Sequence, residues 1–252
     1  MLNNKIRLNK YISYSGICSR RKADNLIKLG LINVNGKNIR ILGYKVNYKD
    51  KIIYNNKILK FNKFIYIILN KPKNCITTTK DNYYRNTILN YIPVKYIKEY
   101  RVYPVGRLDK NTTGVLLLTN NGILCNKLLH PKNKIKKTYK IILNKKIKSN
   151  HIIKLKKGLK FKEGKIYINN IKIIKNKKNI LILSIYIGWN RIIHRIFKTI
   201  GYKVVYLQRI NFGGLKLKKY KIFKEGSYKI IKYKELKKII NKNEKNNYNK
   251  WT

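Results

Sequence analysis

The sequence predicts an α+β protein in two parts, a small α/β module followed by a larger region built mainly on an antiparallel sheet. Apolar residues recur at helical spacing over residues 7–27 and are followed by Asn35-Gly36, the strongest short signal for a β-hairpin. From residue 64 onward, short runs rich in Ile, Val, Leu and Tyr predominate. The chain has 252 residues, 44% of them hydrophobic, so it can bury a core and is not a disordered basic tail.

The amino-terminal module is expected to span residues 1–54. A first helix is predicted over Arg7–Ser15 and a second from Ser19, with Gly30 closing it. The strand Leu31–Val34 then leads into the hairpin turn. Two helices and a hairpin together predict a compact unit.

The larger domain is expected to span residues 64–240, after a polar linker at 55–63. Its apolar runs favour an α+β architecture with a mainly antiparallel sheet. The polar end, 241–252, has the composition of a disordered tail. Strands are expected at 64–69, 101–108, 115–119, 138–143, 165–174 and 179–187, and helices at about 150–157 and 190–200.

The charge of the chain points to a polyanionic partner. Lys and Arg number 61 against nine Asp and Glu, which gives a formal net charge of +52. The abundance of Lys, Asn, Ile and Tyr, against a single alanine, is typical of AT-biased codon usage, so part of this charge is discounted. The remainder still attracts polyanions. Nucleic acid is the first predicted partner and an anionic membrane the second.

Cysteine and histidine usage predicts neither disulfides nor a metal site. The three cysteines, Cys18, Cys75 and Cys125, are odd in number and far apart, which suits a reducing compartment. The histidines lack zinc-ligand spacing. Apolar runs are too short to span a membrane, and organised sequence begins near Ile6, so no leader is expected. We expect the protein to remain in the compartment where it is made, a bacterial cytoplasm or an organelle matrix or stroma.

The first chemical signal is the cationic start of the second helix. Arg20, Arg21 and Lys22 lie in its first turn, where the helix dipole attracts anions, although a solvated charge run is the ordinary alternative. The pattern Arg7-Leu8-Asn9-Lys10-Tyr11-Ile12, Ser15-Gly16, Cys18-Ser19-Arg20-Arg21 and Val34-Asn35-Gly36-Lys37 resembles the S-four RNA-binding domain. The resemblance implies RNA contacts from Arg7, Lys10, Arg20, Arg21, Lys22 and Lys37.

The second signal surrounds Asp109, one of four aspartates in the chain. It follows an apolar strand and lies between Arg107 and Lys110, which favour its ionised form, as a nucleophile or electrostatic stabiliser requires. A turn aspartate bonded to its own backbone is the structural alternative.

The residues around Asp109 resemble a known signature. Gly106-Arg107-Leu108-Asp109, then Thr113-Gly114, Leu116-Leu117-Leu118-Thr119-Asn120 and Gly122 are similar to the signature of bacterial ribosomal-RNA pseudouridine synthases of the RsuA/RluB family. The resemblance spans about Arg7 to Ile240, includes the S-four domain and implies that Asp109 is catalytic, with neither cofactor nor metal. Asn121 departs from it, because the family usually has Asp there.

A second family motif falls on the strand Lys136-Lys137-Thr138-Tyr139-Lys140-Ile141. The resemblance implies that Tyr139 stacks on the target base and assists proton removal. Among 21 tyrosines, an ordinary half-buried strand residue is the alternative.

The third signal is the amphipathic helix after Gly188. Arg191, His194 and Arg195 share one stripe with Lys198, while the opposite stripe is apolar. A solvent-facing basic stripe would give the same pattern. By resemblance, His194 stands where the family usually has a cation beside the catalytic aspartate, and Arg195, which follows it, is the alternative residue for that role. Arg107 and Arg191 are expected to contact RNA.

These signals together predict a monomeric enzyme that isomerises a specific uridine of ribosomal RNA, free or in a ribosome-assembly intermediate, to pseudouridine. The target is expected in 23S rather than 16S rRNA, because the third motif is closer to large-subunit members. A non-catalytic RNA-binding assembly factor with the same fold is the alternative, suggested by His194 and Ile192. A basic protein that binds any polyanion would not explain the ordered motifs.

Overall fold

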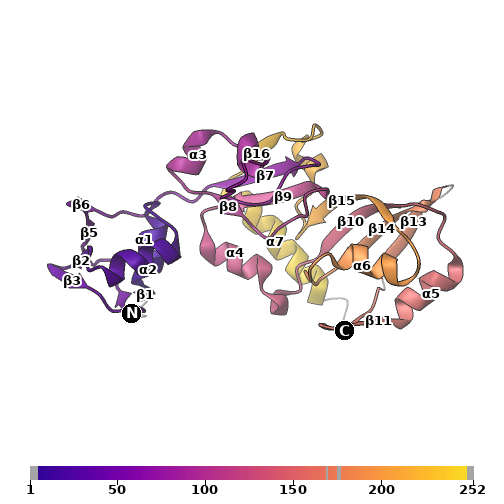
Figure 1. Cartoon of the computed structure of the whole chain (residues 1–252), viewed down its shortest axis with the longest axis horizontal. Helices are drawn as coiled ribbons and strands as arrows, with labels where there is room; N and C mark the ends of the chain where they lie inside the picture. The colour runs from indigo at the N-terminus through magenta and orange to yellow at the C-terminus, as the bar shows by residue number, and fades with distance from the viewer. Residues whose placement is uncertain (1–4, 169, 175–176, 249–252) are drawn as a thin grey trace. The chain divides into compact units, whose positions relative to one another are not determined.

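The computed structural model describes residues 5–168, 170–174 and 177–248, and of 241–248 the backbone alone. The chain forms two compact units (Figure 1). The first contains the chain up to Phe64 together with Val94–Val102, and the second contains Ile65–Pro93 and the chain from Tyr103 onward. The predicted α+β class is confirmed.

The first unit has the predicted helices and hairpin. Ser19 caps α2, because its hydroxyl accepts a hydrogen bond from the Lys22 N–H at 3.3 Å. Asn35 and Gly36 both have positive φ, 50° and 89°, as the tight turn requires. The elements are β1 (Ile6–Arg7), α1 (Leu8–Tyr14), α2 (Arg20–Lys28), β2 (Ile32–Val34), β3 (Lys37–Ile39), β4 (Lys45–Val46), β5 (Ile52–Tyr54), β6 (Lys57–Ile58) and α3 (Val94–Lys98).

The predicted linker, 55–63, is instead part of the first unit. β6 pairs with β5, and Leu59 is buried in the core of the unit, where its carbonyl accepts a hydrogen bond from the Tyr11 hydroxyl at 3.2 Å. The Phe61 ring lies 4.4 Å from the Tyr11 ring. Burial of Leu59 stabilises this segment within the first unit, and the polar residues around it concealed this in the sequence.

The second unit is built on one large sheet with strand order β13-β14-β10-β15-β9-β7-β16, and β8 pairs with β9. β15 and β9 pair in parallel, while the other pairs along this order are antiparallel. The strands are β7 (Tyr66–Lys71), β8 (Tyr103–Pro104), β9 (Thr113–Thr119), β10 (Lys137–Leu143), β13 (Ile171–Ile174), β14 (Lys177–Ile185), β15 (Val204–Phe212) and β16 (Tyr228–Ile230), with a separate hairpin of β11 (Leu159–Phe161) and β12 (Gly164–Ile166).

Helices α4 (Gly122–Leu129), α5 (Ser149–Lys157), α6 (Ile192–Thr199) and α7 (Tyr233–Tyr248), with short 3-10 turns at Ile88–Tyr91, Pro131–Asn133 and Leu217–Tyr220, complete the second unit. α5 and α6 confirm the two predicted helices. Asn121, the departure from the family pattern, caps α4 by accepting a hydrogen bond from the Leu124 N–H at 3.0 Å. Among the described residues no helix is long and apolar enough to cross a membrane.

Two predicted strands are shorter than expected. Of residues 101–108 only Tyr103–Pro104 is extended in the sheet, because proline lacks an N–H for the ladder and Gly106 has a φ of 74°. The stretch 165–174 divides into β12 and β13, and between them the Ile168 N–H donates to the Leu155 carbonyl at 3.1 Å. The backbone at Ile168 is therefore committed to α5 rather than to the sheet.

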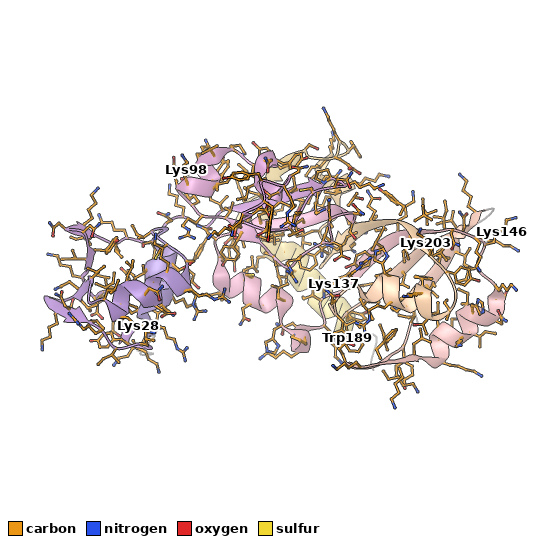
Figure 2. The ribbon with its side chains drawn as sticks, in the orientation of Figure 1. Lys28, Lys98, Lys137, Lys146, Trp189 and Lys203 are labelled. Carbon is orange, nitrogen blue, oxygen red and sulfur yellow. The ribbon has the colours of Figure 1, made fainter. Side chains whose placement is uncertain are left out.

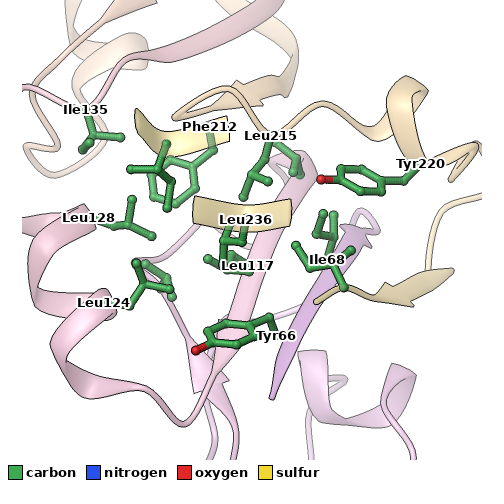
Figure 3. Packing of buried hydrophobic residues seen from close by; sticks show 14 of the residues in the cluster. Tyr66, Ile68, Leu117, Leu124, Leu128, Ile135, Phe212, Leu215, Tyr220 and Leu236 are labelled. Carbon is green, nitrogen blue, oxygen red and sulfur yellow. The ribbon is translucent and has the colours of Figure 1, made fainter. Parts of the chain in front are cut away.

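The core of the second unit lies between the sheet and α7 (Figure 3). Ile68 and Leu117 from the strands pack in one cluster with Leu236 and Ile240 from α7, which are 0% and 3% exposed. The expected disordered tail, 241–252, is wrong for 241–248, where α7 continues. The helix is anchored at its start, and no glycine or proline interrupts it; residues 249–252 lie outside the described residues.

Candidate active site

A cavity of about 620 Å³ opens where the loop before β9 meets β10, β15 and the start of α6. Asp109, Tyr139 and His194 all line this cavity, together with Arg107 and Arg191. These residues lie far apart in the sequence, so the fold brings the three motifs to one place. α6 contacts β15, and Figure 1 shows it in front of the sheet near β10 and β14.

The loop that carries Asp109 is held from beneath by a buried lysine. Lys71, at the end of β7, is 0% exposed, and its Nζ donates to the carbonyls of Pro72, Lys110 and Thr112 at 3.0, 3.1 and 2.9 Å. Burial lowers the pKa of Lys71 to about 8, although nearby acidic groups, including Asp109, act in the opposite direction. The backbone on the carboxyl side of Asp109 is thus fixed by a charged group.

The amino side of the loop is fixed as well. The Thr77 hydroxyl donates to the Leu108 carbonyl at 2.7 Å and accepts from the Leu108 N–H at 3.2 Å. The Thr112 N–H closes a turn on the Asp109 carbonyl at 3.0 Å. The backbone around Asp109 is therefore rigid while its side chain is exposed to the cavity.

Gly114 allows β9 to approach β15 closely. Its φ is 104°, and a Cβ at this position would collide with the backbone of Arg209. A larger residue would therefore push apart the two parallel strands that join the Asp109 loop to the rest of the cavity.

Tyr139 and Arg209 face each other across β10 and β15, next to a register shift between Thr138 and Tyr139. Tyr139 is 8% exposed, and burial raises its pKa, with the neighbouring Arg209 guanidinium opposing that shift. The Arg209 Nε donates to the Val115 carbonyl at 2.9 Å, and its Nη2 has no hydrogen-bond partner among the described residues. Burial lowers the pKa of Arg209.

Arg209 lines the cavity and was not predicted as a site residue. The sequence did contain a signal for this residue. Arg209 alternates with Leu207 along the strand, so it occupies a position on the same face as an apolar side chain. A buried charge in an apolar strand is costly unless it serves a partner or a ligand. Its Nη2 is a buried donor without a hydrogen-bond partner among the described residues.

The α6 residues divide between the cavity and the surface. His194 is half-buried in the cavity wall, where burial and then Arg191 lower its pKa, while Asp109 acts to raise it. Arg195 does not line the cavity; its two Nη atoms bind the two oxygens of Glu163 at 2.7 Å. One helical step of about 100° separates the two side chains, so His194 lines the cavity while Arg195 pairs with Glu163 outside it.

Two further residues of the cavity were missed. The Lys137 Nζ donates to the Tyr186 carbonyl at 2.9 Å, and burial followed by the charge of Arg209 lowers its pKa to about 8. Trp189 lines the same cavity and packs beside Gly164 of the β11–β12 hairpin. Both are labelled in Figure 2. Lys137 precedes Tyr139 by two residues on the same strand face, which is the signal that could have identified it.

The cations predicted to contact RNA from the amino-terminal module are on the surface of the first unit. Lys10 is half-buried, and the others are exposed: Arg7, Arg20, Arg21, Lys22 and Lys37. Arg107 and Arg191 are exposed at the cavity in the second unit. Within the described part of the chain, no group of three His, Cys, Asp or Glu residues could hold a metal ion.

Comparison with known proteins gives a consistent result. A family model described as RNA pseudouridylate synthase matches residues 65–199, and an S4-domain model matches residues 6–52. The chain is 39% identical over 217 residues to the ribosomal large subunit pseudouridine synthase B of Bacillus subtilis, covering 84% of this chain and 87% of that protein. It is 35% identical over 218 residues to the dual-specificity RNA pseudouridine synthase RluF of Escherichia coli, covering 85% and 72%.

A crystal structure of a pseudouridylate synthase matches the fold with a TM-score of 0.65 at 26% identity, covering 93% of this chain and 99% of that chain. The predicted resemblance, fold class and enzyme class are therefore confirmed. The chain belongs to the RNA pseudouridylate synthase family and carries an S4 domain ahead of its synthase domain.

Proposed function

We propose that this chain converts a uridine of 23S ribosomal RNA to pseudouridine, with Asp109 as the catalytic residue. The observation that carries the proposal is the meeting of Asp109, Tyr139 and His194 in one cavity next to the buried Arg209. The B. subtilis relative, named for the large ribosomal subunit, supports the choice of 23S RNA.

The cavity suits a single flipped base. A uridine within folded RNA must leave its stack before its glycosidic bond is accessible, at a cost of a few kcal/mol. Tyr139 offers a ring for stacking, while Arg107, Lys137 and Arg191 bring positive charge to the cavity wall, where phosphates flanking the base would bind.

The reaction rearranges one nucleotide without loss of atoms. The bond between the ribose carbon 1 and the uracil nitrogen 1 breaks with the assistance of Asp109, the uracil rotates, and its carbon 5 bonds to the ribose. The proton on carbon 5 is then removed and nitrogen 1 gains a proton, so the overall charge is unchanged. Tyr139 is assigned to this proton removal; burial raises the pKa of its hydroxyl, and the neighbouring Arg209 guanidinium acts in the opposite direction.

His194 is assigned to the position of the cation that stabilises ionised Asp109. Its imidazole lies in the same cavity wall and interacts electrostatically with the carboxylate. Since imidazole carries charge only below its pKa, this assignment makes the site sensitive to pH.

The test is Asp109→Asn, which preserves shape and removes charge. Pseudouridine formation in large-subunit RNA fragments should be lost, while RNA binding at fixed salt should persist because the cations are untouched. Asp81→Asn is the control, since it removes one carboxylate from a loop that does not line the cavity. Wild-type protein that binds these RNAs without forming pseudouridine would refute the proposal and favour a non-catalytic assembly factor.

A further inference from the structure

A second cavity, of about 550 Å³, lies on the opposite face of the sheet from the candidate active site. Adjacent residues on two strands separate the two cavities. Tyr139 and Arg209 line the active site, whereas Thr138 and Gln208 line the second cavity. Because successive side chains of a strand point to opposite faces, the second cavity is a separate place on the molecule, which we call the back-face cavity.

The back-face cavity is positively charged. Lys136, Lys216 and Lys218 line it, and the last two are exposed to solvent. No aspartate or glutamate is among the described residues that line it. Cations without a neutralising carboxylate suit an anionic group such as a phosphate.

A buried acceptor lies in the same wall. Asn70 is 2% exposed, and its Nδ2 donates to the carbonyls of Phe223 and Lys224 at 3.1 and 3.2 Å, which fixes the orientation of the amide. Its Oδ1 has no hydrogen-bond partner in the described part of the chain. Buried polar atoms are rarely left unpaired, so this oxygen is an unsatisfied acceptor in the cavity wall.

An aromatic ring stands at the rim. Phe223 lines the cavity and yet is 71% exposed. A solvent-facing ring next to lysines is the arrangement with which proteins hold unpaired bases, since every base can stack on it. These groups match the parts of a nucleotide: the lysines match its phosphate, the Asn70 oxygen matches a ribose hydroxyl or a base N–H, and the Phe223 ring matches the face of the base.

We propose that the back-face cavity binds one nucleotide of a single-stranded RNA segment. Phe223 stacks on the base, Lys216 and Lys218 bind its phosphate, and Asn70 accepts a hydrogen bond from a ribose hydroxyl or a base N–H. This proposal rests on the proposed function, because the segment belongs to the RNA that carries the target uridine. It gives the enzyme a second grip on its substrate, away from the reacting base.

The first test measures binding of a labelled oligouridylate to the full chain. Phe223→Ala should weaken binding about tenfold. Lys216→Ala/Lys218→Ala should lower the log-log salt slope by about 0.7, because the two lysines neutralise one single-strand phosphate. The control is Lys154→Ala/Lys157→Ala on α5, which removes the same charge from residues that line neither cavity. It should bind oligouridylate about ten times more tightly than Phe223→Ala does.

The second test separates this proposal from the proposed function. Pseudouridine formation by Phe223→Ala should keep the wild-type kcat and show a raised KM, because the reacting base lies on the other face of the sheet. If Phe223→Ala loses oligouridylate binding while the wild-type protein is inactive on ribosomal RNA, the proposed function is refuted. The proposal for the back-face cavity is then still supported. Two results would overturn the cavity proposal. One is that Phe223→Ala and Lys216→Ala/Lys218→Ala both bind oligouridylate like the control. The other is that free UMP displaces oligouridylate with an affinity equal to that of the oligouridylate.

Discussion

Replacing Lys71 by methionine tests how the Asp109 loop is held. Methionine is similar in length but cannot donate, so the carbonyls of Pro72 and Thr112 lose this partner, while the Lys110 carbonyl keeps the Cys75 N–H at 3.2 Å. Losing a charged donor at these two buried carbonyls costs about 5 kcal/mol, in the upper half of the usual range. The variant also removes a buried charge whose pKa is lowered from 10.5 to about 8, which returns about 3 kcal/mol. The free energy of unfolding near neutral pH should therefore fall by about 2 kcal/mol.

The same substitution should change how stability depends on pH. Between pH 8 and 10.5 folded Lys71 binds fewer protons than Lys71 in the unfolded chain, so unfolding takes up protons and the free energy of unfolding rises with pH. The penalty for the buried charge is complete below the folded pKa and is gone above the unfolded one. From about pH 7 to about pH 10 the gap between wild type and Lys71→Met should therefore widen by about 2 to 3 kcal/mol.

The assay is urea unfolding of both proteins at these two pH values, with pseudouridine formation measured alongside. Lys73→Met is the matched control, because Lys73 is exposed two residues away and its substitution should change neither quantity. Turnover of Lys71→Met should fall in protein that is still folded, since the Asp109 loop loses its support. A stability gap that stays constant with pH, or turnover equal to wild type, would refute the assigned role.

Three further predictions concern the cations. Replacing Arg20–Lys22 by alanine should lower the log-log salt slope of RNA binding by about 0.7 to 0.9 for each phosphate that these side chains neutralise, measured by titration at several salt concentrations; an unchanged slope would mean that they are only solvated. Because burial and Arg191 lower the pKa of His194 below 6.5, turnover should fall as pH rises through that lowered value, and His194→Arg should remove the fall in a pH profile. Arg195→Ala should keep the shape of the wild-type pH profile, since Arg195 lies outside the cavity. If the fall in turnover is absent or occurs at a different pH in this variant, Arg195 contributes to the active site.

Local patterns in the sequence were sufficient for several elements. Ser19 predicted the start of α2, Asn35-Gly36 predicted the first hairpin, and the apolar stripe after Gly188 predicted α6, as the structure shows. The motif around Asp109 predicted the loop that the structure places at the cavity. Each of these signals lies within about ten residues, where turn geometry and helical period act directly on the backbone.

Only the tertiary structure revealed which groups surround Asp109. Lys71 and Arg209 are distant in sequence and reach the site because β7 and β15 both pair with β9. Arg195 is the opposite case, a residue that lies near His194 in the sequence but outside the cavity. The helical stripe alone is compatible with either position, and the pairing with Glu163 on a separate hairpin holds Arg195 away from the cavity. The burial of Leu59 and the anchoring of α7 through Leu236 and Ile240 likewise depend on distant apolar partners. Strand pairing and side-chain contacts join residues that are distant in the sequence. They depend on the free energy of the whole fold rather than on neighbouring residues.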